Sequence, residues 1–137
     1  ASAARAQTNP APRRILVVDD NQDAASSLAM MLASEGHQVE WTNTPQDALE
    51  RVAAFRPDVA LLDIGLPGIS GYELARRIRV LPGFERVRLI ALTGYGQAED
   101  KAEARSAGFD DHLVKPADLD AFHQVLAFSA TDERTRS

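Results

Sequence analysis

Short apolar runs alternate along the chain with segments whose hydrophobic residues recur at helical spacing. Five of the runs have the length and composition of buried strands: residues 15–18, 39–41, 59–62, 87–92 and 111–114. A helical segment follows each run, with Leu28, Met31 and Leu32 on one face of the first and Gly36 ending it. The later helices are predicted to start at Thr44-Pro45, to carry Leu74, Ile78 and Leu81, to span residues 97–107, and to carry Leu119, Phe122, Val125 and Leu126. The pattern therefore predicts five successive strand–helix units.

Regular alternation of strands and helices constrains the fold class. Strands that are apolar on both faces predict an α/β protein whose parallel sheet is covered by helices on both sides. Right-handed crossovers leave few topologies, and the flavodoxin-like (βα)5 arrangement with strand order 2-1-3-4-5 fits five units best. In this order the topology switches between strands 1 and 3, so we expect ligands beyond the carboxyl ends of those strands.

Length and composition indicate one domain with a flexible segment at each end. The chain has 137 residues, of which 45% are hydrophobic, a size at which one core closes. Residues 1–12 are rich in Ala and Pro and lack acids, so we expect a linker there, a domain over residues 13–129 and a polar tail over 130–137. Because the first residue is Ala rather than Met, we expect a domain of a longer protein, although processing or a cloning remnant would look the same.

Charge and residue usage exclude several classes of partner. The formal net charge is −5, so we expect no direct nucleic acid binding and no membrane contact by this domain. No apolar run approaches the roughly 20 residues of a membrane helix, and no cysteine is present for disulfides or thiolate metal sites. This composition suits the cytoplasm. The sequence has no long exposed apolar stripe that would predict a dimer face, so the oligomeric state stays open.

Polar residues with chemical potential follow four of the predicted strands. Asp19 and Asp20 follow the first strand and Asp63 follows the third, whereas Thr93 and Lys115 follow the fourth and fifth. In a parallel sheet these positions share one rim, where each pair of carboxylates repels by roughly 1 to 4 kcal/mol at contact distance. Something cationic must compensate. Oxygen ligands without His or Cys favour Mg²⁺, for which Mn²⁺ is a substitute.

A divalent cation beside a carboxylate, with an ammonium and a hydroxyl aimed at the same point, is what phosphoryl transfer requires. Asp63 stands alone at the end of the central strand and is the best nucleophile, forming an aspartyl phosphate. Asp19 and Asp20 would hold the metal, and the backbone carbonyl of Gly65 is a further candidate ligand. The hydroxyl and the ammonium of the last two strands would each bind a phosphoryl oxygen.

Four segments of the chain resemble the receiver domains of response regulators and hybrid histidine kinases, over about residues 13–128. These segments are ILVVDDN at 15–21, PDVALLDIGLPGISGYEL at 57–74, LIALTGYG at 89–96 and GFDDHLVKP at 108–116. By this resemblance Asp63 matches the phosphoacceptor, Thr93 the switch hydroxyl and Lys115 the phosphate-binding lysine. Asp19 and Asp20 match the family's acidic pair.

The resemblance implies a signalling module that catalyses only its own phosphorylation and dephosphorylation. Its phosphodonor would be a phosphohistidine on a histidine kinase or a histidine phosphotransfer protein. The chain looks most like the receiver of a hybrid sensor histidine kinase, whose parent protein can be anchored in a membrane. A single-domain response regulator is the nearer alternative.

One position departs from the family pattern. Where the family usually has Tyr or Phe as a ring that moves with Thr93, this chain has His112. The resemblance also implies a cis peptide before Pro116, which completes the switch set with these two residues. His112 is either a smaller aromatic substitute or a pH-sensitive latch. In both cases we expect phosphorylation itself to survive.

Three other functions and several structural roles compete with this interpretation. A haloacid dehalogenase-type phosphatase would place two acids as D-x-D after one strand, whereas this chain has adjacent acids after the first strand and a single acid after the third. An FMN binder would need a Ser/Thr/Gly phosphate loop after the first strand, where this chain has two acids. A receiver that is not phosphorylated would lack some of the core site residues, all of which are present here. Asn21 is a candidate helix cap and nothing more. We expect His37 and His123 to be exposed, and Ala98, Ala102 and Ala107 to anchor the fourth helix weakly.

Overall fold

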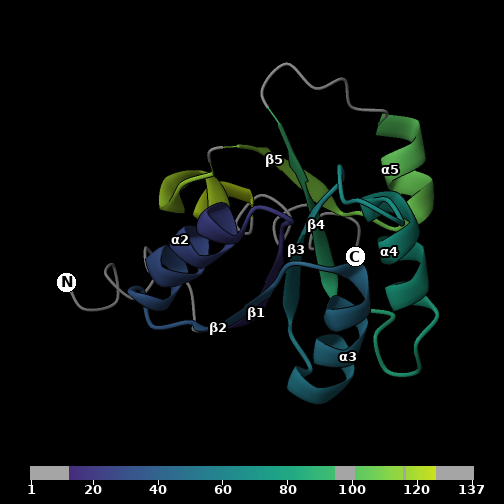
Figure 1. Cartoon of the computed structure of the whole chain (residues 1–137), viewed down its shortest axis with the longest axis horizontal. Coiled ribbons are helices and arrows are strands. Elements are labelled where there is room, and N and C mark those ends of the chain that lie inside the picture. Colours follow the sequence, from purple (N-terminus) through teal and green to yellow (C-terminus); the bar gives the residue numbers. More distant parts are fainter. Residues whose placement is uncertain (1–12, 95–100, 116, 126–137) are drawn as a thin grey trace, which may run out of the picture.

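The structure, a computed structural model, describes residues 13–94, 101–115 and 117–125. Five parallel strands form one sheet in the order β2-β1-β3-β4-β5 (Figure 1). The strands are β1 (Arg14–Val18), β2 (Gln38–Thr42), β3 (Val59–Asp63), β4 (Arg88–Thr93) and β5 (Asp111–Val114). This is the predicted α/β fold with the predicted strand order.

The helices also follow the predicted sequence of elements. They are α2 (Gln22–Ala33), α3 (Pro45–Phe55), α4 (Gly71–Arg79) and α5 (Lys101–Ala107), and the chain is helical again over residues 119–125. Side-chain oxygens of Asn21, Thr44 and Ser70 accept backbone N–H groups at the starts of α2, α3 and α4. Asn21 is therefore the helix cap that was expected. The helix predicted to carry Leu81 ends earlier, and residues 97–100 and Leu126 lie outside the described ranges.

Helices cover both faces of the sheet, and each face has its own apolar cluster (Figure 1). Alternate strand residues such as Leu16 and Leu62 face α3, α4 and α5, whereas Ile15 and Leu61 face α2 and the helix over 119–125. Strand β3 is buried at every residue, as expected for the central strand of such a sheet. Helix α5 is anchored by Ala104 and Ala107, but Ala102 is exposed, so that part of the prediction was wrong.

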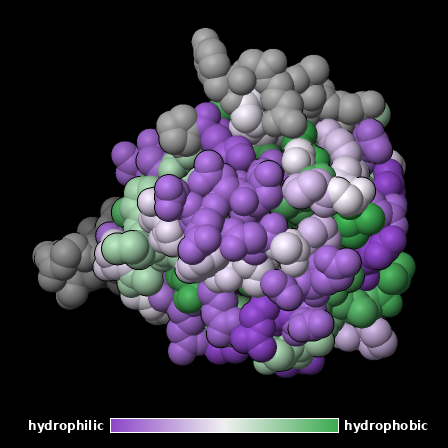
Figure 2. All heavy atoms as spheres, viewed as in Figure 1, coloured by the Kyte–Doolittle hydropathy of each residue, from purple (hydrophilic) through white to green (hydrophobic). Residues whose placement is uncertain are grey.

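The strand register places three polar side chains at one rim. β1 ends one residue before Asp19, β3 ends at Asp63, and β4 ends at Thr93, with Asp63 opposite Leu92 of β4. No helix of the described ranges is long and apolar enough to cross a membrane. The face seen in Figure 2 is mostly hydrophilic, with smaller hydrophobic groups between the polar side chains.

Candidate functional site

Three carboxylates meet at the carboxyl ends of β1 and β3. Ligand oxygens of Asp19, Asp20 and Asp63 all lie within 4.8 Å of one another. Asp19 and Asp63 are 2% and 4% exposed, whereas Asp20 is open to solvent. The close approach of three acids, two of them buried, is the geometry that the positions after the strands predict.

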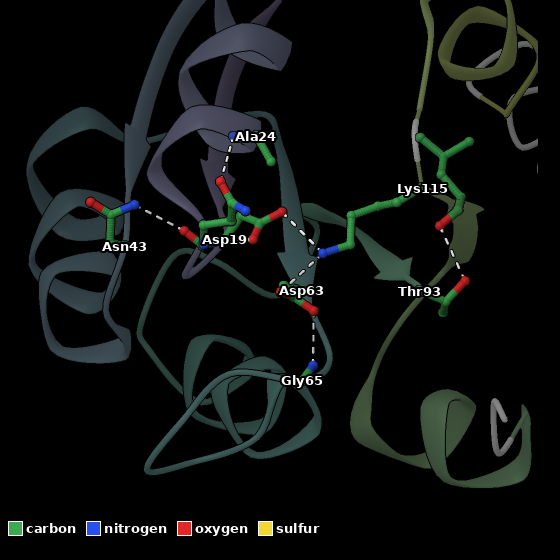
Figure 3. Close-up of polar contacts among 9 residues, drawn as sticks. Asp19, Ala24, Asn43, Asp63, Gly65, Thr93 and Lys115 are labelled. Atoms are coloured by element: carbon green, nitrogen blue, oxygen red, sulfur yellow. Dashed lines mark hydrogen bonds and ion pairs between the residues drawn. The ribbon is translucent and has the colours of Figure 1, made fainter. Parts of the chain in front are cut away.

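A single ammonium bridges the two buried acids. Lys115 Nζ lies 3.2 Å from Asp19 Oδ2 and 3.2 Å from Asp63 Oδ2 (Figure 3). Burial alone would lower the Lys115 pKa, but the charges of Asp63 and Asp19 outweigh it and raise the pKa. The ammonium therefore stays charged where it is needed as a counter-ion.

One lysine does not fully offset the acids. Burial raises the pKa of Asp19 above its ordinary value, and repulsion from Asp63 adds to the rise. The amide of Asn21 and the charge of Lys115 oppose this rise without cancelling it. The site therefore has a residual demand for positive charge, and its ligands are oxygen atoms alone.

Backbone groups fix the orientation of each buried carboxylate. The Asn21 N–H donates to Asp19 Oδ1 at 3.0 Å, and the Gly65 N–H donates to Asp63 Oδ1 at 2.9 Å. The other oxygen of each acid faces Lys115. Asn43 Nδ2 also donates to the backbone carbonyl of Asp19 at 3.0 Å, which ties the loop after β2 to the end of β1 (Figure 3).

Gly71 is a structural requirement of the site that the sequence reasoning missed. A Cβ at this residue would lie 2.5 Å from the carbonyl oxygen of Asp63 and 2.6 Å from Cα of Ile64. The Gly71 N–H donates to the Ile64 carbonyl at 3.2 Å, so the start of α4 is packed against the end of β3. The signal in the sequence was the glycine directly after Ser70, the cap of α4. A helix cap does not itself require glycine at the next residue, so the glycine indicates a close backbone contact.

Thr93 reaches the rim, but its hydroxyl does not face the acids. The side chain is 3% exposed, and Oγ1 donates to the Leu113 carbonyl at 3.4 Å (Figure 3). The Lys115 N–H donates to the Thr93 carbonyl at 2.7 Å, so the ends of β4 and β5 are joined here. The structure therefore brings together four of the five predicted side chains, those of Asp19, Asp20, Asp63 and Lys115. The hydroxyl of the fifth residue, Thr93, points away from them.

The part of the chain that contains this site matches a known protein family. Residues 15–127 match the response regulator receiver domain. The chain belongs to this family. The three acids, Lys115 and all but the first residue of β1 lie within the matched range.

Relatives of this receiver domain include both short and very long proteins. It is 35% identical over 113 residues to the sporulation initiation phosphotransferase F of Bacillus subtilis, covering 82% of this chain and 90% of that protein. It is 39% identical over 133 residues to the virulence sensor protein BvgS of Bordetella pertussis, covering 91% of this chain but only 11% of BvgS. A solved CheY-like receiver domain from Methanospirillum hungatei has a TM-score of 0.77 at 28% identity, covering 91% of this chain and 99% of that one.

The remaining predicted positions of this receiver domain have mixed outcomes. His112 is half-buried on β5, and its Nδ1 lies 3.9 Å from Asp111 Oδ1. The Gly65 N–H donates to Asp63 Oδ1, and the Gly65 carbonyl remains a predicted metal ligand. Pro116 and the peptide before it lie outside the described residues.

The prediction that two other histidines of the receiver domain are exposed was wrong. His37 is 5% exposed, and its ring packs against Phe122 and His123 with centroid distances of 5.9 and 6.1 Å. Its Nδ1 accepts the Arg13 N–H at 3.0 Å, because His37 lies beside the first residues of the sheet rather than at a free helix end. The Nε2 atoms of His37 and His123 are buried without a hydrogen-bond partner.

Proposed function

We propose that this receiver domain accepts a phosphoryl group on Asp63 from a phosphohistidine of a histidine kinase or a histidine phosphotransfer protein. The observation that carries the proposal is the meeting of Asp19, Asp20 and Asp63 within 4.8 Å, with Lys115 bridging the two buried acids. Family membership supports it, since receiver domains belong to two-component signalling systems.

The residues fit a magnesium ion. The three acids supply only hard oxygen ligands, and burial, with repulsion from Asp63, keeps the pKa of Asp19 raised despite the nearby Lys115. Asp19 and Asp20 would hold the ion together with Asp63, and the Gly65 carbonyl is a further candidate ligand. When bound, Mg²⁺ neutralises phosphoryl oxygens; Mn²⁺ is the expected substitute.

The side chains of the site divide the transfer between them. An Asp63 carboxylate oxygen forms the new P–O bond as the P–N bond to the donor imidazole breaks, and that imidazole leaves with a proton. Lys115 moves from the carboxylates to a phosphoryl oxygen, because the transferred group carries more negative charge than the acid alone. Thr93 would turn its hydroxyl from Leu113 to another phosphoryl oxygen, which couples the phosphoryl group to β4 and β5.

Intact mass after incubation with acetyl phosphate and Mg²⁺ tests this function. We expect one added phosphoryl group in the 137-residue chain and none after chelation of the metal. Asp63→Asn should abolish the adduct, whereas Asp58→Asn, a matched change at an exposed acid of the opposite rim, should leave it intact. An adduct of undiminished yield in Asp63→Asn would refute the assignment.

We propose further that the domain is the receiver of a hybrid sensor histidine kinase acting in the cytoplasm. The match to BvgS spans 91% of this chain and 11% of BvgS, as expected for one module of a long sensor. The match to 90% of the short phosphotransferase F keeps a stand-alone regulator as the alternative. An immunoblot of the native cells with an antibody to this domain separates the two, because a band of the size of one receiver domain would favour the stand-alone protein and a band several times larger the hybrid kinase.

A further inference from the structure

A hollow lined by arginines lies at the amino ends of the strands, the rim opposite the acids. Its volume is about 420 Å³, and its cationic residues are Arg13, Arg56, Arg86 and Arg88. Asp58 is the single acid among the residues that line it. Such a concentration of arginine is unexpected in a chain whose formal net charge is −5. We call these four arginines and the space between them the basic hollow.

Two of these arginines are not used by the fold as ion-pair partners. In the part of the chain that the structure describes, no carboxylate forms an ion pair with Arg56 or Arg86. Arg13 adds a buried Nε that has no hydrogen-bond partner. The contrast is Arg79 nearby, whose guanidinium binds the Gly108 carbonyl and Asp110 and is fully occupied. Arg56 and Arg86 therefore bring to the basic hollow positive charge that no carboxylate of the described residues pairs with.

Arg56 occupies its position at a conformational cost. It caps α3 with φ 56° and ψ 65°, and it is the one non-glycine residue with positive φ among the described residues. Glycine or asparagine takes this left-handed position more readily. The arginine instead places its guanidinium carbon 5.1 Å from the centre of the Phe84 ring, beside the hollow. The contact fixes the direction of the cation.

We propose that the basic hollow docks an acidic peptide segment of a partner protein. Guanidinium groups bind carboxylates through paired hydrogen bonds, and several on one rim match a run of Asp and Glu side chains. A nucleotide or nucleic acid would use an exposed aromatic ring for stacking, but Phe84 is 6% exposed and lies beneath Arg56. Because the hollow is at the opposite rim from Asp63, a segment docked there leaves the phosphoacceptor open to its donor.

Fluorescence anisotropy with a labelled oligoglutamate peptide tests the proposal on the full chain. We expect binding that weakens as ionic strength rises from about 0.05 to about 0.3 M, and no binding of an oligoglutamine peptide of the same length. The double variant Arg56→Asn/Arg86→Gln should weaken binding by about tenfold or more. Asparagine is chosen because it tolerates the left-handed conformation at this cap.

Arg77→Gln is the control for net charge, since Arg77 is exposed on α4, pairs with Glu73 at 3.1 Å and lines a different hollow beside Pro67 and Gly68. It removes the same kind of charge and should change the affinity by less than about twofold. Equal weakening by Arg77→Gln and by Arg86→Gln alone would overturn the proposal, because net charge would then explain the binding. Absence of oligoglutamate binding would also overturn it, as would tighter binding of an oligothymidylate that depends on the same arginines. Unchanged acetyl phosphate labelling verifies that each variant is folded.

Discussion

The two rims of the sheet use charged residues in opposite ways. At the amino ends of the strands, Asp58 accepts the Arg14 N–H and Asp110 accepts the Leu89 N–H, each at about 3 Å. Both acids are exposed, and each completes the start of a strand. At the carboxyl ends, Asp19 and Asp63 are buried, close together and bridged by one lysine.

The difference shows which acids belong to the fold and which to chemistry. An acid that pairs with a backbone N–H in solvent stabilises a strand end at little electrostatic cost. Acids that converge in a buried site repel one another and are unfavourable without a cation. The carboxyl rim therefore holds the acids of the proposed phosphoryl-transfer site, whereas the acids of the amino rim complete strand ends and leave Arg56 and Arg86 without a carboxylate partner among the described residues.

The largest effect is expected from Gly71→Ala, which acts on the carboxyl rim alone. Its Cβ would meet the Asp63 carbonyl at 2.5 Å, so the end of β3 must shift. We expect a loss of about 1 to 3 kcal/mol in unfolding free energy and loss of most acetyl phosphate labelling. Gly36→Ala is the control: it is strained by φ +96° but has open space around it, so it should cost about 1 kcal/mol and leave labelling intact. Equal labelling by both variants would contradict the role given to Gly71.

Lys115→Met should separate stability from metal binding at the same rim. Removal of the ammonium leaves Asp19 and Asp63 without their bridging cation, so we expect a loss of about 1 to 3 kcal/mol without Mg²⁺. Mg²⁺ should then raise the melting temperature more in the variant than in the unaltered protein. Thermal melts with and without the ion measure both quantities. A variant that Mg²⁺ stabilises less than the unaltered protein would show that the lysine helps to hold the ion.

A pH titration of stability probes the amino rim through His37. Burial lowers its pKa first, and His123 and Arg13 lower it further, against a smaller opposing effect of Glu35. The folded state therefore holds His37 neutral, and stability is lost as the pH falls below about 6.5, where the unfolded chain takes up a proton. His37→Gln keeps an acceptor for the Arg13 N–H and should reduce this slope, by at most about 1.4 kcal/mol per pH unit. Denaturant midpoints between pH 5 and 7.5 measure it, and an unchanged slope would show that another group titrates.

The smallest effect is expected from His112→Tyr, which introduces an aromatic residue of the kind that the family resemblance leads us to expect. The ring lies on β5 and forms no part of the acid cluster, so acetyl phosphate labelling should change by about twofold or less. The effect should instead fall on partner binding after phosphorylation. Pull-down of the phosphodonor partner by both forms is the measurement, and a large loss of labelling would show that His112 acts within the site.

The sequence predicted the sheet and most of the rim because both follow from residues placed next to strands. Periodicity set the order of elements, and parallel strands bring Asp19, Asp63 and Lys115 to one edge whatever the details of packing. It did not predict the direction of the Thr93 hydroxyl, which depends on a rotamer and on the Leu113 carbonyl. The burial of His37 was missed because it arises from contact with Phe122, far away in sequence. The contact at Gly71 was missed because it depends on how closely the start of α4 packs against the end of β3.

Trapping of the phosphorylated residue tests the central claim most directly. Borohydride reduces an acyl phosphate to the alcohol, so an aspartyl phosphate becomes homoserine, which peptide mass spectrometry locates. After labelling with acetyl phosphate and Mg²⁺, we predict homoserine at position 63 and at neither Asp19 nor Asp20. Homoserine at one of those two acids, or a phosphoryl group that resists reduction, would contradict the account.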